Sequence, residues 1–247
     1  MMTDNNSNWV PSMSTYIDEE ALMKLIQRHG YIEFLRRNRE RSIIKVVSGI
    51  RRCGKSTLFR LFKDELLAEG VKPEQIISIN FEELEYESLR EYHALYQYIL
   101  NQMQPNQMNY IFLDEIQHVD QFHRVVDSLF VKENTDIYIT GSNAYFMSSD
   151  IATLLTGRYV EIQMLPLSFA EFYYSKYEEQ QYSLIPAYEA YLRESSFPYT
   201  QQLGGEDFDI QEYLRGLFNT LLLHDVVARL KINDVTILQD IVRYIMA

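Results

Sequence analysis

A lysine and a serine follow two glycines at the spacing of a phosphate-binding loop. Gly49, four further residues, Gly54, Lys55 and Ser56 match the pattern G-x-x-x-x-G-K-[ST]. The glycines let successive backbone N–H groups point at one anion, while the lysine contacts the terminal phosphates and the serine hydroxyl binds Mg²⁺. The candidate phosphate-binding residues are Gly49, Ile50, Arg51, Arg52, Cys53, Gly54, Lys55, Ser56 and Thr57.

Two adjacent acids form the second candidate group. In "YIFLDEIQ" four apolar residues precede Asp114 and Glu115, which places both acids at the carboxyl end of a predicted strand. Such a pair can divide the work of phosphate hydrolysis. Asp114 would hold Mg²⁺, and Glu115 would act as the general base that polarises the attacking water. The alternative is a solvated acidic turn.

A third polar group follows the apolar run "DIYIT", where Gly141, Ser142 and Asn143 come after Thr140. Asn143 could orient the attacking water or contact the γ-phosphate, and an ordinary asparagine turn is the alternative. The sequence has no N-K-x-D element for a guanine base, which favours ATP over GTP.

These groups need strands and helices to position them, and the sequence supplies both in alternation. Continuous apolar runs predict strands covered on both faces at 43–48, 75–81, 109–114, 136–141 and 159–165. Amphipathic segments predict helices at 56–70, 94–103, 121–134 and 148–157. This alternation predicts an α/β fold in which a parallel sheet lies between helices and binds its ligand at the carboxyl ends of the strands.

Beyond Pro166 the pattern becomes helical and aromatic, which predicts a smaller second region. The segment 197–209, with a proline, two glycines and several acids, is expected to be its internal linker. The tail 236–247 carries apolar residues at helical spacing, as in a chain that continues or needs a partner on that face. We therefore expect an N-terminal helical segment at 1–40, a P-loop core at 41–166, and a helical lid with the start of a further domain at 167–247.

Composition indicates a packed, soluble chain, since 47% of the 247 residues are hydrophobic. The apolar stretches are far shorter than the roughly 18 to 20 residues of a membrane helix, and the polar N-terminus lacks a signal peptide's apolar core. We expect a cytoplasmic protein with no membrane partner. The single cysteine, Cys53, excludes an internal disulfide. Its thiol pKa should fall beside a helix N-terminus, and the alternative is a small side chain that merely fits.

The formal net charge of -12 argues against a surface coated with positive charge for DNA. Basic residues nevertheless concentrate between Arg36 and Lys55. One interpretation is a solvated helix that leads into a loop needing positive charge for a triphosphate. The other is a nucleic-acid patch.

The stretches "KVVSGIRRCGKSTL", "IFLDEIQ", "IYITGSNA" and "LLTGRYVEIQMLPLSFAEF" together resemble a bacterial and archaeal family of AAA-type ATPases with a C-terminal domain of unknown function. The resemblance covers roughly residues 15–175. It implies a P-loop NTPase core, a three-layer sandwich with five parallel strands. It also implies the loop and the acid pair in the roles given above, with Asn143 or Ser142 as the sensor of the γ-phosphate.

Two further residues gain a role only through this resemblance. Asn80, in "INFEE", falls where a polar switch could hold Glu115 inactive, and an ordinary strand-end asparagine is the alternative. Arg158 falls where related ATPases carry an arginine finger for a neighbouring subunit, and its alternative is local pairing with Asp150 or Glu161. The segment "ESSFPYTQQ" departs from the family's Gly-Gly-Phe-Pro type, and longer relatives continue into a nuclease-like fold.

Two functions follow from these features. In the first, the chain is an enzyme that binds ATP and Mg²⁺, hydrolyses ATP to ADP and phosphate, and acts as a switch or motor on a macromolecular partner, a protein or a nucleic acid. The arginine finger would make it a homo-oligomer. The alternative is an ATP-gated binding module with negligible hydrolysis, either alone or associated with DNA through the basic segment 36–52 and the helical C-terminal region.

Overall fold

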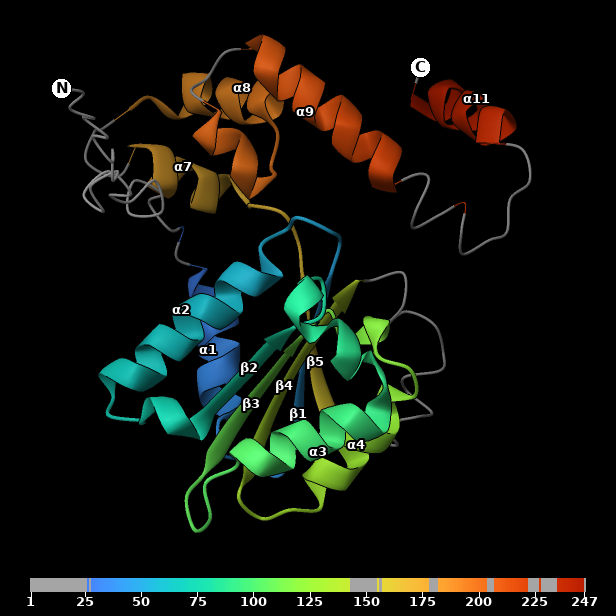
Figure 1. Cartoon of the computed structure of the whole chain (residues 1–247). Helices are drawn as coiled ribbons and strands as arrows, with labels where there is room; N and C mark the ends of the chain where they lie inside the picture. Colours follow the sequence, from blue (N-terminus) through green and yellow to red (C-terminus); the bar gives the residue numbers. More distant parts are fainter. Residues whose placement is uncertain are drawn as a thin grey trace, which may run out of the picture.

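The computed structural model describes residues 26, 28–142, 155, 157–177, 182–203, 207–221, 227 and 235–246. Its centre is a sheet of five parallel strands (Figure 1). In the order in which they lie side by side, the strands are β2 (Ile76–Asn80), β3 (Asn109–Asp114), β4 (Thr135–Ser142), β1 (Ile44–Gly49) and β5 (Tyr159–Met164). The predicted strands are all confirmed, and every bound lies within a single residue of its expected position.

The strand order brings the candidate groups together at the carboxyl ends of the strands. Because β4 lies between β1 and β3, it separates the strand that leads into the loop from the strand that carries the two acids. At the carboxyl ends, Gly49 is paired in register with Ser142, and Asn80 is paired with Asp114. Four strands from distant parts of the sequence thus end beside one another.

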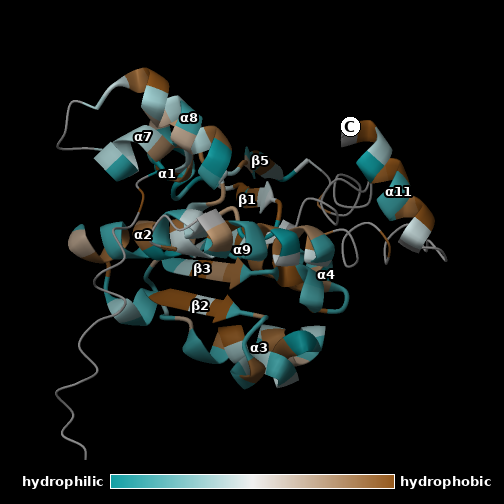
Figure 2. Ribbon diagram, turned by 90° about the horizontal axis from the view of Figure 1, so that it is seen from above, coloured by the Kyte–Doolittle hydropathy of each residue, from teal (hydrophilic) through white to brown (hydrophobic). Residues whose placement is uncertain are grey.

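Two helices cover each face of the sheet. The helices α1 (His29–Asn38) and α2 (Lys55–Ala68) lie on one face, and α3 (Tyr92–Gln102) and α4 (Phe122–Phe130) lie on the other (Figure 1). Figure 2 shows apolar strands, such as β2, and helices that carry both hydrophilic and apolar residues. Both faces of each inner strand are therefore buried, which explains the continuous apolar runs in the sequence.

Adjacent strand residues serve opposite layers. Val46 packs in the cluster that includes Leu95 of α3 and Val125 of α4, whereas Val47 packs with Phe59 and Phe62 of α2. Most of the expected helix at 148–157 lies outside the described residues. No helix in the described part of the chain is long and apolar enough to cross a membrane.

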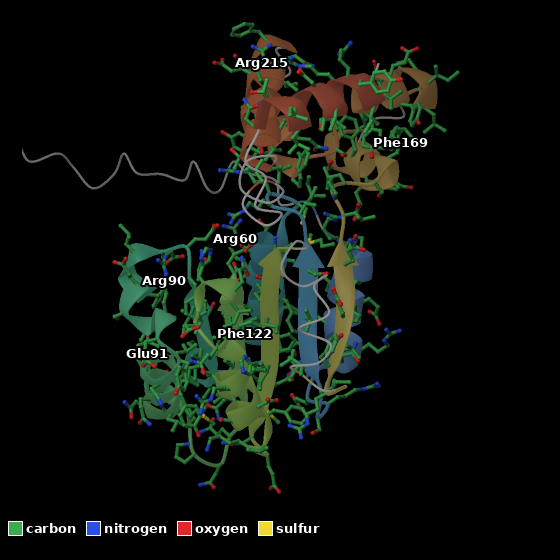
Figure 3. The ribbon with its side chains drawn as sticks, turned by 90° about the vertical axis from the view of Figure 1, so that its right-hand side faces the viewer. Arg60, Arg90, Glu91, Phe122, Phe169 and Arg215 are labelled. Atoms are coloured by element: carbon green, nitrogen blue, oxygen red, sulfur yellow. The ribbon has the colours of Figure 1, made fainter. Side chains whose placement is uncertain are left out.

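A smaller helical region lies above the carboxyl ends of the strands. It contains α7 (Phe169–Tyr177), α8 (Leu184–Glu194) and α9 (Asp207–Thr220), and Figure 3 shows this region over the strand ends, with Phe169 and Arg215 labelled. The final described helix is α11 (Val235–Met246), which carries the helical spacing expected for the tail. The predicted linker at 197–209 does connect two helices, since α8 ends at Glu194, and only its last three residues belong to α9. Pro198–Gln202 forms a 3-10 helix, since proline suits the first helical position, and α9 already begins at Asp207.

A buried ion pair lies in the aromatic part of the core. Lys45 of β1 donates to the carboxylate of Asp136 at the start of β4, and both side chains are fully buried. The hydroxyl of Tyr138 also donates to Asp136, at 2.6 Å, and the Tyr138 ring stacks on Phe112 with 4.7 Å between centroids. Burial lowers the pKa of Lys45, and Asp136 opposes that shift. Each partner is therefore needed to compensate the buried charge of the other.

Candidate functional site

The loop between β1 and α2 has a backbone that depends on its two glycines. A Cβ atom on Gly49 would lie 2.4 Å from the carbonyl oxygen of Met164 and 2.9 Å from Sγ of Cys53. Gly54 has a φ of 106°, which is in the region that favours glycine. The close approach of β5 thus requires a glycine at the first position, and the left-handed backbone favours one at the second.

The N-terminus of α2 is suited to an anion. Gly54 is the N-cap and has no side chain with which to bond the first N–H groups of the helix. The first N–H groups of the helix therefore receive no side-chain cap from this residue, and they lie at the positive end of the helix dipole. This loop is a cradle of the kind that phosphates occupy.

Lys55 folds back over the loop. Its side chain is buried, and Nζ donates to the carbonyl oxygens of Gly49 at 3.1 Å and Ile50 at 3.3 Å. Nζ also lies 3.1 Å from Oε1 of Glu115. The lysine therefore links the loop to the acid pair on β3, although Lys55 and Glu115 are far apart in the sequence.

Asp114 is held by hydroxyl groups from two other elements. Thr140 of β4 and Ser56 of α2 each donate a hydrogen bond to its carboxylate. Burial raises the pKa of Asp114 above its ordinary value, and the two hydroxyl donors only partly offset this effect. A buried carboxylate beside a serine hydroxyl at a helix N-terminus provides oxygen ligands of the kind that Mg²⁺ prefers, with phosphates supplying the others. The site therefore fits a metal ion that arrives with a nucleotide.

Glu115 follows the strand in a left-handed conformation with a φ of 53°. Its backbone N–H donates to Oγ1 of Thr140 at 2.8 Å, and its side chain turns toward Lys55. Burial acts to raise the pKa of the Glu115 carboxyl, but the charge of Lys55 and hydrogen bonds from Gln117 and Lys55 outweigh it, so that the pKa is lowered. The carboxylate is thus kept ionised, which a general base requires.

Thr140 and Gln117 are the residues that the sequence did not single out. Thr140 was noted only as part of a polar cluster, yet it is fully buried and bonds both members of the acid pair. Its neighbour Ser142 ends β4 beside Gly49, as the parallel pairing requires. Asn143, the other candidate γ-phosphate sensor, lies outside the described residues, so its role stays a prediction.

Asn80 lies at the carboxyl end of β2, near the acid pair, but its side chain bonds residues other than Glu115. Its Nδ2 donates to Glu83 at 3.1 Å, and its Oδ1 accepts from the backbone N–H of Glu82 at 3.1 Å. These bonds fix the turn that follows β2. Control of Glu115 by Asn80 stays a prediction.

Arg158 lies at the amino-terminal ends of the strands, whereas the loop lies at their carboxyl ends. Its carbonyl oxygen accepts from the N–H of Ile44 at the start of β1, so about 16 Å of strand separates it from the loop. The guanidinium lies 3.6 Å from Asp127 and 5.6 Å from the ring centre of Phe130, both on α4. The structure thus pairs Arg158 with a local acid different from the two expected ones. Its half-exposed position leaves it accessible to a neighbour.

Cys53 corrects one expectation. Its side chain is fully buried in the core cluster under α1 and α2, and burial raises the pKa of its thiol, against a weaker opposing effect of Lys55. The desolvation cost of a thiolate thus exceeds the benefit of the helix terminus. The prediction of a low thiol pKa is wrong, and the alternative of a small side chain that fits is confirmed.

Most of the basic side chains between Arg36 and Lys55 form ion pairs with acids of the same chain. Arg36 donates to Glu65 at 2.6 Å, and Arg51 lies 2.9 Å from Glu82. The other internal pairs of the segment are Arg36–Glu33, Arg39–Glu40, Arg39–Glu69, Lys45–Asp136 and Lys55–Glu115. These contacts favour the interpretation of a helix and loop stabilised by their own acids over a nucleic-acid patch.

The helical region touches the loop at two points. A Cβ atom on Gly54 would lie 3.9 Å from Pro198 in the 3-10 helix of that region. Arg28, which is buried, donates to the carbonyl of Cys53 at 3.2 Å, to that of Leu165 at 2.8 Å, and to Glu171 of α7 at 2.6 Å. One guanidinium therefore joins the loop, the segment after β5 and α7 of the helical region.

The chain is similar to proteins of one family. A family model described as an AAA domain matches residues 41–173. An uncharacterized protein of Haemophilus influenzae is 37% identical over 224 residues, which are 90% of this chain and 55% of that protein. An uncharacterized protein of Methanocaldococcus jannaschii is 34% identical over 208 residues, which are 78% of this chain and 44% of that protein. The chain spans about half the length of these curated relatives.

A solved structure has the same architecture. The Walker-type ATPase PABY2304 of Pyrococcus abyssi superimposes with a TM-score of 0.51 at 17% identity, over 80% of this chain and 73% of that chain. A likeness at this level of identity concerns the fold alone. The predicted α/β fold of the P-loop type is confirmed by it together with the parallel sheet.

Proposed function

Because the chain belongs to the AAA domain family, we propose that it binds ATP with Mg²⁺ and hydrolyses the ATP to ADP and phosphate. One observation carries the proposal. Four side chains from two segments far apart in the sequence meet in a hydrogen-bonded group at the N-terminus of α2: Lys55, Ser56, Asp114 and Glu115. Holding a nucleotide needs the first two, and the acids add the means to cleave it.

Each residue has a distinct task in this proposal. The loop N–H groups and Lys55 bind the phosphates, so that Lys55 leaves Glu115 when a nucleotide enters. Ser56 and Asp114 would hold Mg²⁺, which neutralises charge on the phosphates. Glu115 then accepts a proton from the water that attacks the terminal phosphorus.

We also propose that hydrolysis drives a switch or motor that acts on a macromolecular partner, a protein or a nucleic acid, in the cytoplasm. The lid supports this, because Pro198 and Arg28 connect it to the loop, where a change of bound nucleotide acts first. The position of Arg158 supports a homo-oligomer, in which the arginine serves a neighbouring site. The internal ion pairs of the basic segment favour this function over an ATP-gated, DNA-associated module.

Calorimetry with Mg-ATP and an assay of phosphate release test the proposal together. The parent protein should bind ATP and release phosphate, and Lys55→Ala should bind none, because the triphosphate loses its main cation. Lys72→Ala removes an exposed lysine beyond α2 and should behave as the parent. Unchanged affinity in a folded Lys55→Ala variant would overturn the assignment of the site. Turnover measured with and without DNA, RNA and cell extract would identify the class of partner.

A further inference from the structure

The side chain of Gln117 binds the carboxylate of Glu115, and we propose that Gln117 is the positioning residue that holds Glu115 for proton transfer. Its Nε2 donates to Oε2 of Glu115. The inference rests on the proposed function, because it assigns a task only if Glu115 is the base. It adds a residue that none of the expected roles included.

The local backbone explains how a residue two positions away can reach Glu115. The left-handed conformation of Glu115 turns the chain at the end of β3 and opens the 3-10 helix Ile116–His118. His118 closes this turn, since its N–H donates to the carbonyl oxygen of Glu115 at 3.2 Å. In a tight turn of this kind Gln117 folds back over the carboxylate instead of extending away from it.

The chemistry of the pair fixes which end of the amide faces Glu115. An ionised carboxylate only accepts hydrogen bonds, so the amide nitrogen must point toward it. The amide oxygen Oε1 then points elsewhere, and it is buried without a hydrogen bond from any described residue. A buried amide with a purely structural task normally has both ends paired. Within the described part of the chain, the hydrogen bond of the Gln117 amide is thus directed at Glu115.

The two oxygens of Glu115 have different partners, and this difference defines the task. Lys55 lies 3.1 Å from Oε1, whereas Gln117 binds Oε2. When Lys55 moves to a phosphate, Oε1 becomes free to accept a proton. The hydrogen bond from Gln117 stays in place during this exchange, so the Glu115 side chain keeps one rotamer and the carboxylate keeps its orientation.

Asn80, the residue that the family resemblance suggests for control of Glu115, is occupied by Glu82 and Glu83. Among the described residues, Glu115 is instead contacted by Lys55 at Oε1 and by Gln117 at Oε2. The residue that positions Glu115 is therefore Gln117, in the turn after β3, and not Asn80 at the end of β2.

The test compares steady-state kinetics and ATP affinity for Gln117→Ala and the parent protein. We expect kcat to fall about 10- to 100-fold, the usual effect of losing a hydrogen bond to a charged group. The KM and the Kd for ATP should stay within about twofold, because Gln117 contacts the base and not the nucleotide. Gln97→Ala makes the same change on the exposed face of α3 and should leave all three values unchanged.

A double variant separates positioning from a general effect on folding. In a Glu115→Gln background, Gln117→Ala should cause no further loss, because the carboxylate that it positions is absent. Gln117→Asn shortens the side chain by one methylene while keeping the amide, and it should match Gln117→Ala. It provides the same comparison if the alanine variant does not fold.

Parental kcat in the Gln117 variants, or a loss that adds in full to that of Glu115→Gln, would overturn the inference. A loss that appears only as weaker ATP binding would also overturn it. The proposed function fails separately, if Glu115→Gln itself turns over ATP at the parental rate. An inactive Glu115→Gln with a fully active Gln117→Ala rejects the inference and leaves the function standing.

Discussion

The ammonium group of Lys55 lies 3.1 Å from a carboxylate oxygen of Glu115, and both side chains are buried. The cation expected to meet a phosphate and the base expected to activate water therefore neutralise each other. Attraction between buried charges is strong, so Lys55 is drawn away only by another anion of comparable strength. We therefore predict that entry of a triphosphate would release Glu115 from Lys55 in the same step.

Glu115→Gln tests this coupling. The variant should bind ATP at least as tightly as the parent, because Lys55 no longer has a competing carboxylate. Hydrolysis should slow by roughly 10² or more, since an amide cannot accept the proton. Calorimetry and phosphate release measure the two effects, with the exposed Glu87→Gln as the control. Weaker binding, or turnover at the parental rate, would contradict the coupling.

Gly49→Ala tests the cradle. The added methyl group would lie 2.4 Å from the carbonyl oxygen of Met164, so either β5 or the loop must move. We expect a loss of ATP binding together with a destabilisation of about 1 to 3 kcal/mol, as for other overpacked sites. Gly30→Ala is the matched control, because a methyl group there has no neighbour within 4 Å. Chemical unfolding and calorimetry would decide, and a Gly49→Ala variant with parental affinity would disprove the requirement.

Cys53 should be unreactive in the folded protein. Because burial raises the pKa of its thiol, the folded state keeps the proton at a pH where the unfolded chain has begun to release it. Stability linked to this group is therefore present at neutral pH and falls as the pH rises into the alkaline range. Maleimide labelling should be slow in native buffer and should rise with unfolding by denaturant. Rapid native labelling that ATP blocks would show instead that the thiol lines the nucleotide site.

Arg158→Ala tests action on a neighbouring subunit. The local contact with Asp127 is half-exposed and is worth at most about 1 kcal/mol, so the fold and ATP binding should persist. Turnover should fall by about 10³ or more if the arginine is a finger. The exposed Arg37→Ala should have no such effect.

Mixing the two inactive proteins gives the decisive result for Arg158. An interface between Arg158→Ala and Glu115→Gln subunits can combine an intact Glu115 with an intact Arg158, so activity should return. If the mixture is inactive at every ratio, or if the parent is a fully active monomer at every concentration, the arginine does not act across an interface.

Hydrophobic periodicity and motif spacing were enough to predict the parallel sheet and to place the candidate site at the carboxyl ends of its strands. The strands were recognisable because burial on both faces leaves an uninterrupted apolar run, as in β1 and β3. The loop and the acid pair were recognisable because phosphate chemistry restricts which residues can stand at those positions. Lys55 and Glu115 consequently meet at the carboxyl end of β3, where the strand pattern placed the acids.

Contacts that depend on the three-dimensional path of the chain were not predictable. Nothing in the sequence near Lys45 indicates that Asp136 lies beside it, because that pair forms only when β1 and β4 align. The pKa of Cys53 was misjudged since a helix terminus can be read from sequence, while the depth of burial cannot. Gln117 went unnoticed because its contact depends on a left-handed turn at a non-glycine residue.

The bonds of Arg28 set a limit on how this chain can be divided. Its guanidinium reaches Cys53 in the loop, Leu165 after β5 and Glu171 in α7, so the boundaries at 40 and 166 that the sequence suggested cut through one buried cluster. A recombinant core shortened at either boundary would leave a charge or a carbonyl without its partner. Protein engineers who wish to exchange the helical region between relatives should therefore transfer the segment around Arg28 with it.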